Sequence, residues 1–269
     1  MKRTLCLLLA AIMALALVGC GGEEGASVDG DASYTEDNLL TSEETANMFN
    51  NVEDYVGRSV NLYGEIFNEV PSDDSGTFFQ MFCDPEKAEK DVMVFVDGGY
   101  TVETDNIVLV KGVVTDSYTG DNAFGGEVTC PLISAKSVED ATYADAFAPA
   151  LKTVKPGVKL EIERAVFTID KVEFAEAETR ISLSVKNSGS SAVYISTYGA
   201  SIIQSGEQYE CQDNYDADYK ILPDSIKAGA TTSGYLVFPA IKQSDFKLVL
   251  DISTETNWYD GEEIPVSVK

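Results

Sequence analysis

Three aspartates lie close together in the segment CQDNYDADY, which spans Cys211 to Tyr219. The carboxylates of Asp213, Asp216 and Asp218 are the hard oxygen ligands that Ca²⁺ prefers in extracellular proteins. Their spacing is not that of an EF-hand, because the central glycine and the terminal glutamate are missing. The segment therefore predicts either a calcium-binding loop or a solvated acidic loop, since a chain this acidic forms such clusters by chance.

Aromatic residues form a second group that could do chemistry. In the predicted strand that contains them, Tyr63 and Phe67 point away from the apolar residues, and Phe95 does the same in a later strand. Phe78 and Phe82 share one side of their own strand and could join the group. Such a patch would bind a sugar, a peptide or an apolar partner.

The cysteines allow two interpretations. Cys83 and Cys130 fall at strand ends of one predicted domain and could form a disulfide in an oxidising compartment. Cys211 lies in the other predicted domain and would then remain a free thiol. In the alternative interpretation, all three are small apolar residues of the core.

The chain has no histidine, which excludes most hydrolytic mechanisms and the commonest zinc ligand. An enzyme of this composition would depend on carboxylates alone, as glycosidases do. No pair is singled out among the 45 acidic residues, so the sequence predicts no catalytic residue, no metal site beyond the weak calcium loop and no cofactor.

The N-terminus has the parts of a secretory signal. Lys2 and Arg3 precede an apolar run, 5–18, that is short for a membrane span. The sequence LVGC, which ends at Cys20, resembles the lipobox of bacterial lipoproteins. The resemblance implies cleavage after residue 19, lipidation of Cys20 and stable anchoring by several acyl chains. The alternative is an ordinary signal peptide that happens to end near a cysteine.

The charge of the chain argues against nucleic acid as a partner. The net charge is −26, and removal of residues 1–19 with their two cations makes it −28. A protein this acidic repels phosphate backbones. Between residues 46 and 140 there are 18 acids and five bases, which leaves no basic groove for a nucleic acid.

The elements that must position these residues begin after a flexible acidic spacer, 20–40. Thr41 and Glu44 have capping-box spacing, which predicts a short amphipathic helix. Phe49 and Val52 of this region would cover the aromatic patch if it is not a binding surface, and the second domain could do the same.

Five alternating runs follow within 58–140, which predicts a small five-stranded OB-like barrel over 41–140. The stretches DYVGRSVNLYGEI and VKGVVT, with Gly64 and Gly112 at expected bends, resemble the tRNA-anti-like OB-fold of secreted bacterial proteins. The charge pattern opposes the nucleic-acid binding that this family name suggests.

A linker, 141–156, is expected to end at Pro156 and Gly157, and nine further alternating runs predict an immunoglobulin-like β-sandwich over 157–269. The segments VKNSGSSAVYIS and KAGATTSGYLVFP resemble a telokin-like domain of unknown function that is common in Gram-positive surface lipoproteins.

The sequence thus predicts a mainly β protein held on the extracytoplasmic face of the cell membrane by a lipid at Cys20. Its expected function is that of a binding or scaffolding module of the cell envelope, with an envelope protein or a glycan as partner. The alternative is a carboxylate-dependent enzyme that acts on envelope glycans.

Overall fold

The structure, a computed structural model, describes residues 33–70, 76–85, 87–121 and 127–269. The chain divides between Thr142 and Tyr143 into two compact units, which are described in turn. The predicted signal peptide, Cys20 and most of the predicted spacer lie outside the described residues. Within the described ranges, no helix is long and apolar enough to cross a membrane.

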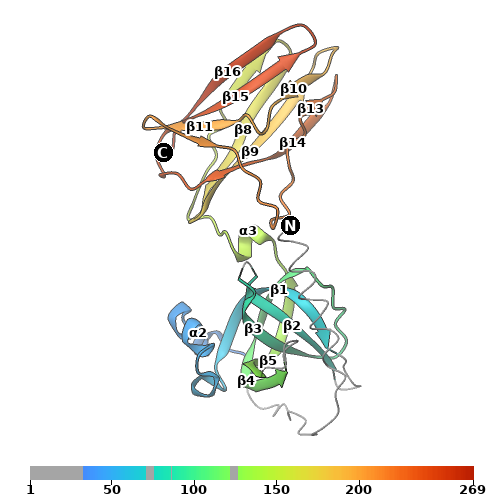
Figure 1. Cartoon of the computed structure of the whole chain (residues 1–269), viewed down its shortest axis with the longest axis vertical. Coiled ribbons are helices and arrows are strands. Elements are labelled where there is room, and N and C mark those ends of the chain that lie inside the picture. The colour runs from blue at the N-terminus through green and yellow to red at the C-terminus, as the bar shows by residue number, and fades with distance from the viewer. Residues whose placement is uncertain (1–32, 71–75, 86, 122–126) are drawn as a thin grey trace. The chain divides into compact units, whose positions relative to one another are not determined.

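The first unit is a closed barrel in the strand order β1-β2-β3-β5-β4 (Figure 1). Its strands are β1 (Ser59–Val70), β2 (Gly76–Asp84), β3 (Glu89–Asp97), β4 (Ile107–Asp121) and β5 (Glu127–Asp140). Neighbouring strands are antiparallel, except that β3 and β5 run parallel. The insertion of β5 between β3 and β4 gives the predicted OB-like barrel.

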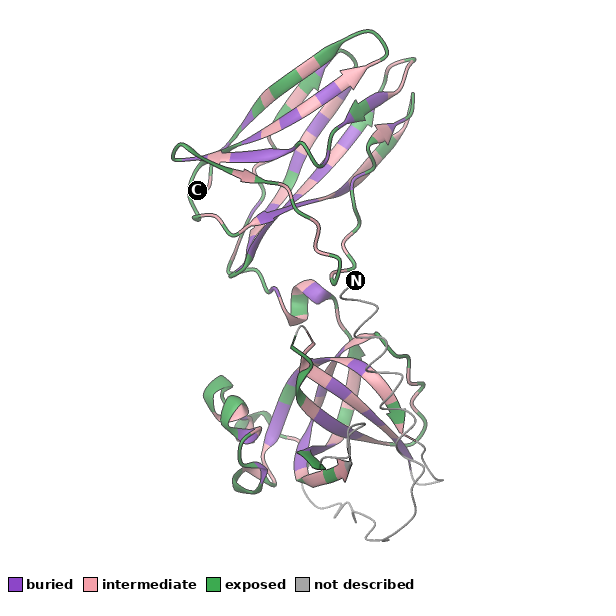
Figure 2. Cartoon of the chain, in the orientation of Figure 1, coloured by how far each residue is buried: buried purple, intermediate pink, exposed green. Residues whose placement is uncertain are grey.

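The barrel interior is filled by the inward half of each alternating strand (Figure 2). The fully buried inward residues include Val60, Ile66, Phe79, Met81, Val92, Val94, Val108, Val110, Val114 and Ile133. Gly112 allows β4 to bend over β5, because a Cβ atom there would come within 2.5 Å of the Ser134 carbonyl oxygen. The register of β4 and β5 shifts at this glycine.

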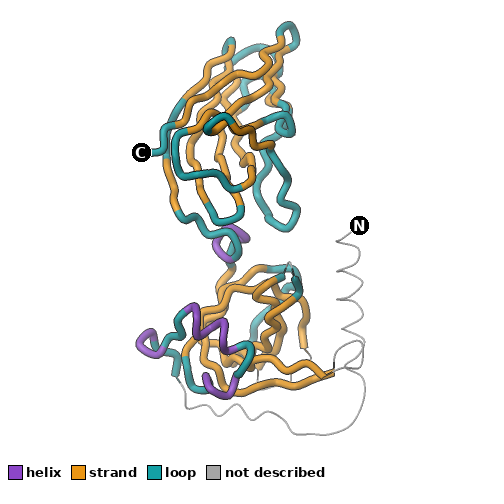
Figure 3. The backbone as a smooth tube through the Cα atoms, turned by 60° about the vertical axis from the view of Figure 1, so that its left-hand side comes forward, coloured by secondary structure: helices purple, strands orange, loops and turns teal. Residues whose placement is uncertain are grey.

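Short helices close one side of the barrel (Figure 3). They are η1 (Glu36–Asn38), α2 (Ser42–Met48) and η2 (Val52–Tyr55). The predicted capping box starts α2: the Glu44 N–H donates to Thr41 Oγ1 over 3.3 Å, and the Thr41 N–H donates to Glu44 Oε2 over 2.8 Å.

The predicted spacer ends earlier than expected. Leu40 is buried in the barrel core, and its N–H donates to the Ser59 carbonyl over 2.8 Å. Tyr34 Oη donates to Asn61 Oδ1 over 2.9 Å. Because Leu39 and Leu40 supply apolar surface at the barrel wall, residues 34–40 belong to the folded unit and not to a free spacer.

The second unit is a two-sheet sandwich. One sheet has the order β14-β9-β8-β6, with β7 also on β8; the other has the order β12-β11-β15-β10-β13, with β16 also on β15. The elements are α3 (Tyr143–Ala146), β6 (Lys152–Val154), β7 (Lys159–Ile162), β8 (Ala165–Phe174), β9 (Glu178–Asn187), β10 (Val193–Ile195), β11 (Ser201–Gln204), β12 (Glu207–Glu210), β13 (Ser225–Ile226), β14 (Thr231–Pro239), β15 (Phe246–Thr254) and β16 (Trp258–Val266).

The sandwich core lies between the two sheets and consists of their inward residues, among them Phe167, Ile181, Leu183, Ile202, Phe238, Leu248 and Leu250. The alternation that buries them along each strand is visible in Figure 2. Together with the barrel, this sandwich confirms the predicted mainly β fold class.

The structure corrects the prediction that residues 141–156 form a linker. Its second half contains β6, which pairs with the end of β8 and adds a strand to the sandwich. Val154 is buried in the sandwich core. The short run KTV has too few residues to show a strand period, so only its pairing partner reveals it.

Candidate functional site

The outer side of β1, β2 and β3 is built of three cross-strand rows, which we call the barrel face. Residues paired across antiparallel strands point to the same side of a sheet, so the register gives each row. The rows are Glu65, Phe82 and Asp91; Asn68, Gln80 and Met93; and Val70, Phe78 and Phe95. A row with amides therefore lies between two rows that carry aromatic rings.

The aromatic rings of the barrel face form two pairs. The ring centroids of Phe67 and Phe82 lie 3.9 Å apart with 14° between the planes, which is a stacked arrangement. Those of Phe78 and Phe95 lie 4.8 Å apart at 46°. All four residues are half-buried, so each keeps an exposed part on which a ligand can pack.

Tyr63 does not share a ring pair with the other members of the predicted patch. It pairs with Leu109 of β4, whereas Phe67 contacts Phe82 of β2. Its phenol also contributes to the raised pKa of Lys111, after the larger effect of Glu139. The structure thus divides the predicted patch, because β1 has a different neighbour on each of its two edges.

A chain of polar groups crosses the barrel face. Asn68 Nδ2 donates to Gln80 Oε1 over 2.9 Å, and Gln80 Nε2 donates to Asp91 Oδ2 over 3.5 Å. Among the described residues, buried Asp91 Oδ1 has no hydrogen-bond partner. Burial raises the pKa of Asp91 to about 6, and the Val92 N–H partly opposes this. An orphaned acceptor with a perturbed pKa is a marker of functional surfaces.

The N-terminal helix does not cover the barrel face as one sequence interpretation expected. Met48 and Val52 are buried in the barrel interior, and Phe49 packs against the same core cluster. The interior and the barrel face are opposite sides of the strands. The helix therefore closes the barrel core and leaves the aromatic pairs outside it.

The predicted disulfide between Cys83 and Cys130 is absent, and both residues are free thiols. Cys83 packs against the barrel interior, whereas Cys130 belongs to a separate cluster with Met93 and Leu132 on the other side of the wall. Burial raises the pKa of each thiol to about 12, which makes both unreactive at neutral pH. Cys211 is also free.

The three aspartates of the acidic loop are not gathered into a metal-binding group. Among the residues that the structure describes, no group of three or more acidic or cysteine side chains is arranged to hold a metal ion. Asp213 instead accepts a hydrogen bond of 2.6 Å from Tyr215 Oη. The three carboxylates are thus close in the sequence without forming such a group.

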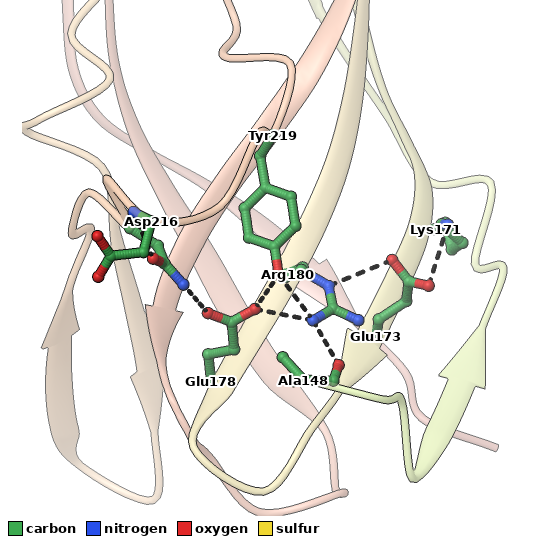
Figure 4. A network of polar contacts seen from close by, with 8 residues as sticks. Ala148, Lys171, Glu173, Glu178, Arg180, Asp216 and Tyr219 are labelled. Atoms are coloured by element: carbon green, nitrogen blue, oxygen red, sulfur yellow. Dashed lines mark hydrogen bonds and ion pairs between the residues drawn. The ribbon is translucent and has the colours of Figure 1, made fainter. Parts of the chain in front are cut away.

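Beneath the acidic loop lies a buried ion network around Arg180 of β9, which is 1% exposed (Figure 4). Arg180 Nη1 donates to Glu178 Oε1 over 2.8 Å and to the Ala148 carbonyl over 2.7 Å. Tyr219 Oη donates to the same Glu178 oxygen over 2.6 Å. Arg180 Nε lies 3.6 Å from Glu173 Oε2. Paired and hydrogen-bonded in this way, the charges can remain in the interior.

The network ties the acidic loop to the outer side of the β9 sheet. Asn214 Nδ2 donates to Glu178 Oε2 over 3.0 Å, and Arg180 lies 5.4 Å from the centre of the Tyr219 ring. Burial, followed by the bond to Glu178, raises the pKa of Tyr219. The arrangement fixes the position of the loop and exposes no reactive group.

Beside this loop is a cavity of about 450 Å³. The loop 211–224 and the turn that contains Tyr198 line it, together with Tyr235, Leu236 and Val237 of β14. Its size is within the range of small-ligand pockets. Neither the cavity nor the Arg180 network was predicted from the sequence, because both depend on which strand the loop crosses. The sequence feature that could have indicated them is the presence of two tyrosines, Tyr215 and Tyr219, in the loop 211–224.

A family match lies within the sandwich. No curated protein matches the chain. Among solved structures, "a functionally unknown protein from Listeria monocytogenes EGD-e" matches 48% of this chain and 94% of its own length, at 10% identity and a TM-score of 0.37. Residues 154–264 match the family described as "Domain of unknown function (DUF4352)".

Proposed function

We propose that this chain is a membrane-anchored, extracytoplasmic lipoprotein that acts as a binding or scaffolding module at the cell envelope. The observation that carries the proposal is the barrel face, where two aromatic pairs flank the amides of Asn68 and Gln80. Rings and amides together suit a ligand that has both apolar faces and hydroxyl groups. The ligand is a glycan.

A glycan fits this surface better than a peptide strand or a nucleic acid. The barrel is closed by the pairing of β1 with β4, which disfavours strand addition, because that mode of binding needs a long open sheet edge. The first row of the barrel face carries Glu65 and Asp91, which repel phosphate. Sugar rings can stack on phenylalanine while their hydroxyls bond to amides.

The row of Glu65, Phe82 and Asp91 also bears on the alternative that the protein is a carboxylate-dependent enzyme. Glu65 and Asp91 are paired with Phe82 from opposite sides, so Phe82, on whose ring Phe67 stacks, stands between the two residues in the register. A glycosidase needs its two carboxylates on either side of an open substrate position. The arrangement supports binding in preference to hydrolysis.

The anchor and the family resemblances rest on the sequence. The lipobox-like LVGC ending at Cys20 supports lipidation and an extracytoplasmic location. We also propose that the sandwich, most of which matches a domain of unknown function, is telokin-like and that the five-stranded barrel is a tRNA-anti-like OB-fold.

The glycan proposal is tested with chitotetraose as the probe and residues 33–269 as the protein, by titration calorimetry. Phe67→Ala and Phe95→Ala should each weaken binding about tenfold, which corresponds to about 1.4 kcal/mol. Tyr63→Ala is the matched control, because Tyr63 is an aromatic residue of β1 outside the ring pairs. Equal binding by all three variants, or none by the unmodified protein, would reject this ligand face.

The anchor is tested separately. Cys20→Ser should abolish metabolic labelling with a radioactive fatty acid and release the protein from the membrane fraction. Retention of the variant with its lipid label would contradict lipidation at Cys20 and leave the glycan test unaffected.

A further inference from the structure

The cavity of the sandwich is walled by two tyrosines that meet at one carboxylate. Tyr198 lies in the turn after β10, and Tyr215 lies in the loop 211–224. Tyr215 Oη donates to Asp213 Oδ2 over 2.6 Å, and the same carboxylate raises the pKa of the Tyr198 phenol. The rings are 67% and 69% exposed for Tyr215 and Tyr198, so their faces remain open to a ligand.

The charge around the cavity is negative. The loop 211–224 contains four aspartates and one cation, Lys220. Lys220 does not line the cavity, and its Nζ lies 3.4 Å from Ser233 Oγ. The lining includes Asp213, Asp218 and Asp224 and no basic side chain. The neighbouring Arg180 is matched by Glu178 and Glu173, so the network adds no net positive charge.

Phenols that donate to a carboxylate gain electron density in their rings, and electron-rich rings attract cations. Aromatic residues around an acidic group are the usual surroundings of bound ammonium groups. A lysine-sized alkyl chain also finds apolar surface here, since the exposed residues Ile221 and Pro223 line the cavity.

We propose that this cavity binds an organic ammonium group, with Asp213 as its counter-ion and the rings of Tyr198 and Tyr215 as its walls. This site is separate from the glycan surface proposed for the barrel, and neither depends on the other. The ammonium group comes from a lysine side chain of a polypeptide or from a free diamine.

The test is titration of residues 33–269 with Nα-acetyl-L-lysine amide, followed by NMR of the tyrosine ring signals. We expect millimolar binding that shifts the signals of Tyr198 and Tyr215. Nα,Nε-diacetyl-L-lysine amide has a similar chain without the charge and should bind at least about tenfold more weakly. Putrescine identifies the source: binding as tight as that of the lysine amide indicates a free diamine, and weaker binding indicates a polypeptide side chain.

Variants test whether the named residues bind the ammonium group. Asp213→Asn, which keeps the size of the side chain, should weaken binding about tenfold, and Tyr198→Leu should have a similar effect. Tyr194→Leu is the matched control, because Tyr194 is 42% exposed in the same unit and does not line the cavity. Far-ultraviolet circular dichroism confirms that each variant is folded. Unchanged binding in Asp213→Asn, or equal binding of the diacetylated probe, would overturn the proposal.

Discussion

Asp91 has an unfavourable environment in the barrel. Its Oδ1 atom is buried without a hydrogen-bond partner among the described residues, and the group is close to the hydrophobic cluster of Met93 and Cys130. A buried acceptor without a hydrogen bond lowers the free energy of unfolding. Such a cost is expected where a surface is arranged for a ligand and not for folding alone.

We expect Asp91→Asn to stabilise the barrel in a pH-dependent way. The pKa of Asp91 is raised from an ordinary value of 3.8 to about 6, so the folded state favours the protonated acid. The contribution of this group to stability is present below about pH 4 and is lost as the pH rises through about 6. The variant should gain up to about 3 kcal/mol over the native protein at pH 7.5 and little at pH 4.

Urea unfolding of both proteins at the two pH values measures this difference. Asp97→Asn is the matched control, because Asp97 is an exposed aspartate of the same strand. A stability difference between Asp91→Asn and the native protein that is the same at both pH values would contradict the assignment.

Arg180 supports a second prediction at the scale of single residues. Arg180→Met should destabilise the sandwich by about 3 to 5 kcal/mol, because Glu178 would remain buried without its cation, whereas Glu173 keeps its ion pair with Lys171. Addition of Glu178→Gln to that variant should restore part of the loss. Urea unfolding gives the double-mutant cycle, with Lys186→Met as the exposed control on β9. Additive losses would show that the pair is not coupled.

At the scale of elements, the loop 211–224 depends on the strand that it crosses. The Tyr235 N–H donates to the Lys220 carbonyl, and the Gln212 N–H donates to the Val237 carbonyl, both over 2.8 Å. Gly234 makes this close crossing possible, because a Cβ atom there would collide with the backbone of Leu222. Two backbone hydrogen bonds thus hold the loop over β14, and the absence of a side chain at Gly234 allows it to lie this close.

Gly234→Ala should therefore lift the loop from β14. We expect a loss of about 1 to 3 kcal/mol, typical of overpacking, and faster hydrogen exchange at the amides of Tyr235 and Gln212. Thr231→Ala, at an exposed position of the same strand, is the control. Exchange rates equal to those of the native protein would show that the loop tolerates the added methyl group.

At the scale of the whole molecule, the boundary between the two units determines which fragments can fold. The strand β6 and the carbonyl of Ala148 both belong to the sandwich, although they precede the Pro156 and Gly157 boundary suggested by the sequence. A cut before Tyr143 preserves them, whereas a cut before Val154 removes Ala148 and all of β6 except its last residue.

We expect fragments 33–142 and 143–269 each to unfold cooperatively, because each has its own core cluster. Fragment 154–269 should be less stable than 143–269 by about 2 kcal/mol or more, since Arg180 loses a charge-assisted hydrogen bond and β8 loses most of its partner β6. Urea unfolding compares the two. Dye binding by 33–142 or 143–269, as in a molten state, would contradict the division.

Alternation along the chain was enough to predict the fold class and most of the strands. The runs at residues 59–70 and 76–84 coincide with β1 and β2, because a strand with one side in the core must place apolar residues at every second position. The helix start at Thr41 and Glu44 was predictable for a similar reason, since a capping box is a contact between near neighbours in the sequence.

Tertiary structure alone decided which side chains meet. The sequence placed Tyr63 and Phe67 on one side of a strand, but the neighbours of β1 on its two edges separated them and brought Phe67 to Phe82. The sequence placed both Cys83 and Cys130 at strand ends, but the two side chains pack in different clusters on opposite sides of the barrel wall. Local patterns record which side of an element faces the core, whereas a binding site depends on contacts between residues distant in the sequence, which no local period encodes.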